Sequence, residues 1–237
     1  MGELKYEIKG TVHQVAEIHL DQGQRVFSET GGMIWMDPSV EMDTAMPGTQ
    51  KGFLGALGGA LQRAVAGESL FLNYFTAKSG AGRVAFASSF LGNIIPIALA
   101  AGQSIIAQRG AFLVGQDGVE IKVEFTRKIG VGFLGGEGFI LQRLTGPGMI
   151  FLEIDGEVTM IELAAGQQVK VDTGHLAAFE DTVKYDIEIQ KNIKNMLLSG
   201  EGFALAIMTG PGKVWLQNQT IQGLAGLLKP FFPDRSS

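Results

Sequence analysis

Residues Met149–Asp172 read MIFLEIDGEVTMIELAAGQQVKVD, two runs rich in apolar side chains followed by an alternating segment. A period of two is typical of β-strands, because successive side chains point to opposite faces of a sheet. Asp155-Gly156 separates the two runs and predicts a β-hairpin, since glycine tolerates the positive φ of a tight turn. A turn at Thr173-Gly174 follows, so the segment predicts short antiparallel strands.

Short sequence motifs, which we call marks, recur along the chain. Leu163-Ala164-Ala165-Gly166-Gln167 matches Leu20–Gln24 and Leu99–Gln103, and a Gly-Glu mark follows each at Glu68, Glu137 and Glu201. From Gly-Gln to Gly-Glu is 34 residues in copies two and three and 44 in copy one. This self-similarity indicates three tandem copies with an insertion in the first. We interpret the repeated Gln24, Gln103 and Gln167 as turn residues.

The predicted fold is all-β, with three tandem β-sandwich-like repeats around a pseudo-threefold axis and short helical linkers. The repeats are predicted at 3–79, with a helical insertion at 50–66, at 82–147 and at 148–219. An apolar segment, 220–237, follows them in one compact unit. The strand at Tyr6–Gly10 resembles the one at Val214–Gln217, so we expect copy three to meet copy one and cover both free edges.

Composition excludes several classes of protein. The 237 residues are 46% apolar and 18% charged, with a net charge of −5 and no cysteine. Disulfide scaffolds, cysteine-ligated zinc and thiol catalysis are therefore excluded. An acidic chain is poorly suited to neutralise nucleic-acid phosphates. We see no secretory signal and no run of about 18 apolar residues, so we expect a cytoplasmic protein.

Two apolar segments are candidate contact surfaces. They place apolar side chains at helical spacing in the insertion and near the end of the chain, at Phe53, Leu54, Leu57, Leu61, Leu224, Leu227, Leu228 and Phe231. Exposed apolar patches mark partner or membrane surfaces. The alternative is that both segments plug the ends of the β core.

Asp172 and His175 are the candidate ligand-binding residues. A histidine beside carboxylates can bind a metal or act as a base, and the alternative is a turn histidine bonded to backbone. Glu68, Glu137 and Glu201 could converge on an ion, but a repeated residue is more often structural.

Two further sequence patterns do not indicate a binding site. Gly130–Gly135 matches a dinucleotide fingerprint with Asp155 beyond it, yet a strand is predicted where that motif needs a helix. His13 and His19 lie about 20 Å apart along one strand, too far to share an ion. We assign no catalytic, metal or cofactor-binding residue and no cofactor.

The Gly-Glu and Thr-Gly-Pro-Gly marks, Thr173–Thr182 and Gly223–Pro230 resemble the altered-inheritance-of-mitochondria twenty-four family, in the same order from Leu4 to Pro233. The resemblance implies a threefold repeat of units similar to the subunit of the tryptophan-RNA-binding attenuation protein. Eukaryotic relatives are associated with mitochondrial inner-membrane organisation, which implies a scaffold or membrane-adjacent role. No catalytic residue follows from it.

The leading functional hypothesis is a non-enzymatic scaffold or interaction protein, cytoplasmic or peripheral at a membrane, with a protein, a membrane surface or further copies of itself as partner. The alternative is a small-ligand- or metal-binding β-protein, or an enzyme, centred on His175. RNA binding is a second alternative, which the net charge of −5 and the few aromatic side chains disfavour.

Overall fold

A computed structural model describes residues 2–29, 31–45, 71–127, 139–189, 204–228 and 231–232. Most of these residues form antiparallel strands, which confirms the all-β class. The predicted helical insertion lies outside the described residues. So do the glycine-rich motif and several candidate residues, namely Phe53, Leu54, Leu57, Leu61, Glu68, Glu137 and Glu201.

The strands are short, as the period of two and the frequent turns predict. Their bounds are β1 Lys5–Lys9, β2 Val15–Leu20, β3 Arg25–Glu29, β4 Met33–Met36, β5 Val40–Ala45, β6 Leu72–Ala77, β7 Gly82–Ala87, β8 Gly92–Leu99, β9 Ser104–Gln108, β10 Phe112–Gln116, β11 Glu120–Arg127, β12 Phe139–Thr145, β13 Gly148–Asp155, β14 Val158–Leu163, β15 Gln168–Asp172, β16 Leu176–Glu180, β17 Lys184–Ile189, β18 Ala204–Thr209 and β19 Gly212–Gln217. Two 3₁₀ turns, η1 Arg109–Ala111 and η3 Thr173–His175, and one α-helix, α3 Ile221–Leu228, accompany the strands.

Four sheets contain these strands. Sheet A has the order β1-β2-β7-β4, sheet B β5-β6-β3-β10-β13-β8, sheet C β11-β12-β9-β16-β19-β14 and sheet D β15-β18-β17. The order recurs with an offset of six strands, so we define strand set 1 as β2–β7, set 2 as β8–β13 and set 3 as β14–β19. Sheets B and C each join strands of two neighbouring sets.

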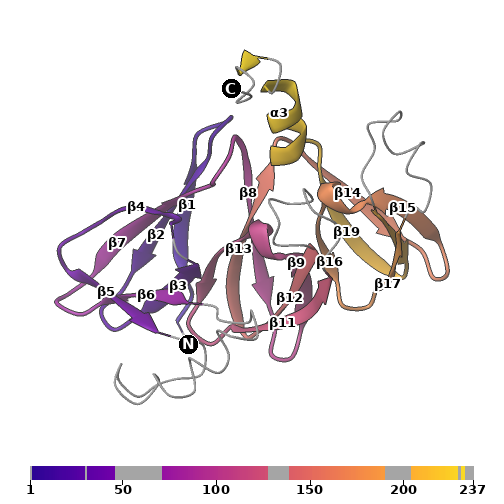
Figure 1. Cartoon of the computed structure of the whole chain (residues 1–237). Coiled ribbons are helices and arrows are strands. Elements are labelled where there is room, and N and C mark those ends of the chain that lie inside the picture. Colours follow the sequence, from indigo (N-terminus) through magenta and orange to yellow (C-terminus); the bar gives the residue numbers. More distant parts are fainter. Residues whose placement is uncertain are drawn as a thin grey trace, which may run out of the picture.

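Three apolar cores lie between the half-sheets, and each also includes residues of a neighbouring strand set. The first core contains Phe75 and Phe86, whose rings meet edge to face at 5.1 Å. The second includes Leu144 and Leu152, and the third includes Phe179 and Met208. The three strand sets lie side by side in sequence order (Figure 1).

The repeated glutamines are turn residues, as the sequence indicates. The side-chain oxygens of Gln24, Gln103 and Gln167 each accept the backbone N–H three residues earlier, at 2.8, 3.0 and 3.0 Å. The same hydrogen bond therefore closes the turn at all three positions.

The predicted hairpin at Asp155-Gly156 is wrong. Strand β13 pairs with β8 and β10, whereas β14 pairs with β19 in another sheet. Both edges of β13 are occupied, so the chain crosses from sheet B to sheet C at this turn. Gly156 still adopts a positive φ of 74°, and its N–H donates to the Leu91 carbonyl at 2.8 Å.

The expected closure of copy three on copy one is also wrong. Among the described strands, sheets A and D share no ladder, and β4 and β15 lie on opposite sides of the molecule (Figure 1). Neighbouring sets meet through the pairings of β3 with β10 and of β9 with β16, and also at their connecting loops, where His13 forms a bridge with Gly92 and Gly92 with Gly156. Among the described strands, the two edges that closure would have covered have no neighbour.

Candidate functional site

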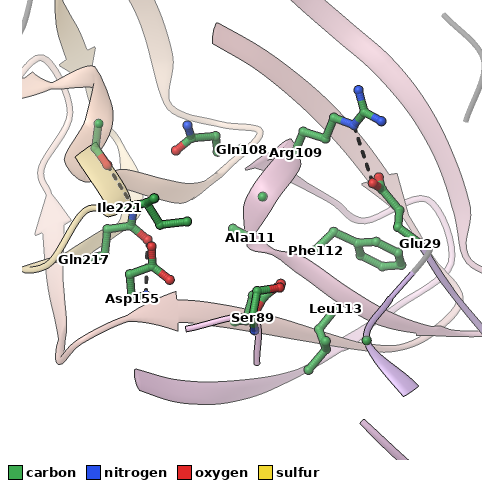
Figure 2. Close-up of a pocket in the computed structure, with 14 residues that line it drawn as sticks. Glu29, Ser89, Gln108, Arg109, Ala111, Phe112, Leu113, Asp155, Gln217 and Ile221 are labelled. Carbon is green, nitrogen blue, oxygen red and sulfur yellow. Dashed lines mark hydrogen bonds and ion pairs between the residues drawn. The ribbon is translucent and has the colours of Figure 1, made fainter. Parts of the chain in front are cut away.

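A cavity of about 260 Å³ lies where the three strand sets meet, and both polar and apolar residues line it. Its walls come from the end of β3, the turn η1, the ends of β13 and β19, and the first residue of α3. Figure 2 shows Arg109 and Glu29 on one side of the cavity and Asp155 with Gln217 on the other. The volume lies just below the range of about 300–1,000 Å³ that is typical of ligand pockets, so the cavity fits a small molecule.

Glu29 is held in place by two donors. The Arg109 Nε lies 3.5 Å from one of its carboxylate oxygens, and the Gln142 side-chain nitrogen donates to the other at 2.7 Å. Gln142 is fully buried in β12, and its side-chain oxygen has no hydrogen-bond partner among the described residues. A buried amide oxygen without a hydrogen-bond partner lowers the stability of the folded state.

Glu153 is a buried acid on β13, with 6% of its surface exposed. It accepts hydrogen bonds from the Ser89 backbone N–H and from the Ser89 hydroxyl, the latter at 3.2 Å. The pKa of Glu153 is raised to about 7, mainly by burial and to a smaller extent by the charges of Asp155 and Glu29, while the two Ser89 hydrogen bonds oppose the shift. Burial also raises the pKa of Asp155 to about 6. Both acids therefore exchange protons near neutral pH.

The two residues that the sequence singled out lie beside the cavity. The Asp172 carboxylate accepts the Gly174 N–H at 2.9 Å and so caps the turn η3. His175 donates from Nδ1 to the Gln217 carbonyl oxygen at 2.7 Å. The cavity wall at this point consists of Gly174 and Gln217. A binding role for Asp172 and His175 stays a prediction, while their turn and backbone contacts are observed.

Sequence reasoning did not single out Glu29, Arg109 or Glu153. One signal was present, because Glu153 interrupts the apolar run Met149–Ile154. A charged residue inside a strand buried on both sides is uncommon. Asp155 was considered for a dinucleotide motif, but it ends a strand of an antiparallel sheet.

A second cluster of ionisable groups is already neutralised. Glu7, Glu17 and His19 place ligand atoms within 4.8 Å of one another. However, the Lys9 ammonium lies 2.6 Å from Glu17, and the Arg83 guanidinium lies 3.5 Å from it. Both cations pair with the Glu17 carboxylate and neutralise it, so we assign no metal site to this cluster.

The end of the chain exposes an apolar surface. Thr220 caps α3 by accepting the Gly223 N–H at 2.9 Å, and the helix carries no charged residue. Beyond it, Phe231 is 83% exposed. We call this surface the apolar apex, and it comprises the exposed residues Val12, Leu91, Ile221, Leu227, Leu228, Phe231 and Phe232.

Hydrogen bonds between loops hold the apolar apex together. Gly92 donates to the Val12 carbonyl at 2.7 Å, and Gln219 donates to the Asp155 carbonyl at 3.2 Å, just before α3 begins. Figure 1 shows α3 above the loop tips of the β-sheets. Leu224 is half-buried, whereas Leu227 and Leu228 are exposed, so the helix keeps an uncovered apolar side. None of the helices in the described ranges is long and apolar enough to cross a bilayer.

Fold and site together define a protein of joined antiparallel β-sheets with a cavity between them and an exposed apolar helix. Residues 6–219 match the model of the family described as Mitochondrial biogenesis AIM24. The chain belongs to this family.

Two similar proteins come from Streptococcus pyogenes. An uncharacterized protein of the serotype M6 strain is 29% identical over 225 residues, covering 94% of this chain and 88% of the relative. A protein of the same species with an X-ray crystal structure is 24% identical, with a TM-score of 0.79, 97% of this chain and all of that chain being covered. The similarity to the crystal structure shows that the two proteins share a fold.

Proposed function

We propose that this protein is a non-enzymatic scaffold that docks on a lipid bilayer through the apolar apex. The three strand sets, which we interpret as three tandem copies of one unit, form the body that carries this surface. The observation that carries the proposal is the exposure of Leu227, Phe231 and Phe232, at 68, 83 and 67%. Three large apolar side chains at one end of a chain are typical of a contact surface.

The chemistry of the apex favours lipid over an anionic partner. Residues 221–228 have no charged side chain, and the whole chain has a net charge of −5. Attraction to anionic headgroups would need clustered cations. Burial of each leucine or phenylalanine side chain contributes about 1.5–3 kcal/mol, so insertion depends on the apolar side chains. Aromatic residues also favour the interfacial zone of a bilayer.

Vesicle flotation tests this proposal. We expect the full chain to float with zwitterionic phosphatidylcholine vesicles and the double variant Leu227→Ser, Phe231→Ser to remain at the bottom. Both side chains are exposed, so the variant keeps its fold. Met42→Ser is the matched control, because Met42 is an exposed apolar residue on β5, away from α3 (Figure 1). Equal flotation of the double variant and the wild type would overturn the proposal.

A second function, binding of a small ammonium compound, is favoured by the cavity. Three carboxyl groups, those of Glu29, Glu153 and Asp155, line it together with the single guanidinium of Arg109. An ammonium group near Asp155 would meet a carboxylate that forms no ion pair with a cation of the described residues.

Thermal unfolding with small amines and matched neutral alcohols tests this second function. A bound ligand raises the melting temperature, because it binds the folded state alone. We expect stabilisation by amines, and loss of that stabilisation in Asp155→Asn. A shift that persists in the variant, or the same shift with the alcohols, would contradict ammonium binding at this site.

A further inference from the structure

Strand sets 1 and 2 are joined by the antiparallel pairing of β3 with β10. In this junction Phe27 lies opposite Gly115 and Val26 opposite Gln116. Sets 2 and 3 are joined by the antiparallel pairing of β9 with β16, where Ile106 lies opposite Phe179. Each junction extends a three-stranded half-sheet of one set into the next.

The two junctions have the same register. The second Gly-Gln mark lies 79 residues after the first, and the third lies 64 residues after the second. By the first offset Phe27 corresponds to Ile106, and by the second Gly115 corresponds to Phe179. The bulge that precedes each junction also recurs, between Met33 and Trp35 in β4 and at the equivalent positions of β10 and β16. One pairing geometry is therefore used twice within the chain.

The same geometry leaves one half-junction at each end of the molecule. Strand β15 corresponds to β3 and β9, and among the described strands it pairs with β18 alone. Strand β4 corresponds to β10 and β16, and it pairs with β7 alone. The two edges lie on opposite sides of the molecule, so one chain cannot join them to each other (Figure 1).

Burial distinguishes the unpaired edge from its paired equivalents. Ile34 in β4 is 51% exposed, whereas the equivalent Leu113 in β10 is 3% exposed and Ala177 in β16 is fully buried. Trp35 is also exposed, while the equivalent Val114 and Ala178 are fully buried. An apolar edge strand without lysine or proline is the kind that pairs with another chain.

We infer that β15 of one molecule pairs antiparallel with β4 of a second copy, in the register of the internal junctions. Lys170 then lies opposite Met36, and Val171 lies opposite Trp35. This interface joins two different surfaces, so it assembles chains head to tail into a ring or a filament. It goes beyond the docking of the apolar apex on a bilayer and uses none of those residues.

The cysteine-free sequence allows a direct test of this register. Met36→Cys in one chain and Lys170→Cys in another would lie directly opposite each other, at a separation that a disulfide spans. We expect an equimolar mixture of the two single variants to form a disulfide-linked heterodimer under mild oxidation. Met42→Cys mixed with Lys170→Cys is the matched control, because Met42 is exposed on a different sheet edge.

Light scattering gives an independent readout. The wild type is expected to exceed the 25.3 kDa of one chain increasingly as its concentration rises. Ile34→Glu is expected to abolish this rise, because position 34 lies opposite Asp172 in this register and two carboxylates would then face each other. A wild type that stays monomeric at all concentrations, or a heterodimer yield no greater than that of the control, would overturn the inference. Vesicle flotation of Ile34→Glu should be unchanged, which separates this failure from failure of the bilayer proposal.

Discussion

Replacement of Glu153 by glutamine should remove most of the pH dependence of stability near neutral pH. Burial raises the pKa of Glu153 from 4.5 to about 7 in the folded protein. The folded state therefore holds the proton more tightly than the unfolded state does. The resulting stabilisation is complete below pH 4.5 and is lost as the pH rises through about 7. The shift corresponds to about 3 kcal/mol of unfolding free energy.

Glutamine keeps an acceptor oxygen for the two Ser89 donors but cannot ionise. We expect Glu153→Gln to match the wild type near pH 4 and to be more stable than it near pH 8, by up to about 3 kcal/mol. Urea unfolding followed by tryptophan fluorescence at several pH values measures the difference. Glu120→Gln, at an exposed position of β11, is the control. If the wild type and Glu153→Gln lose stability in parallel between these pH values, the acid is not buried as the structure places it.

Three further outcomes are expected. Gly92→Ala should lower stability by about 2–3 kcal/mol in chemical denaturation, because its Cβ would overlap the Ile154 carbonyl oxygen, whereas Gly110→Ala, with open space around it, should have little effect. Gln167→Ala should cost about 1 kcal/mol in the same assay, since it removes the bond to the Ala164 N–H. Vesicle binding should persist in high salt, because the apolar apex uses no charge, and a steep loss of flotation with salt would contradict that.

The local features of the fold follow from the sequence because they depend on neighbouring residues. Alternation in Val183–Ile189 predicts strand β17, and the turn at Thr173-Gly174 is the short helix η3. The hairpin at Asp155-Gly156 is wrong because a turn signal says that the chain reverses but not which strand becomes the partner. The same limit applies to closure, since repeated marks identify copies without showing how their sheets join.

The positions equivalent to His175, by the offsets of the Gly-Gln marks, are Gly32 and Ala111, and both line the cavity. The sequence drew attention to His175 because its side chain is ionisable, whereas a glycine or an alanine gives no such signal. In the structure these two small residues lie at the cavity wall, and His175 lies beside it, bonded to the Gln217 carbonyl.

The three equivalent strand ends at Glu29, Gln108 and Asp172 explain this asymmetry. Glu29 and Gln108 end β3 and β9, the strands that join a neighbouring set, and both line the cavity. Asp172 ends β15, which has no such neighbour among the described strands, and its carboxylate caps its own turn. A polar side chain at this position therefore faces a cavity where the junction is made and a local backbone donor where it is not.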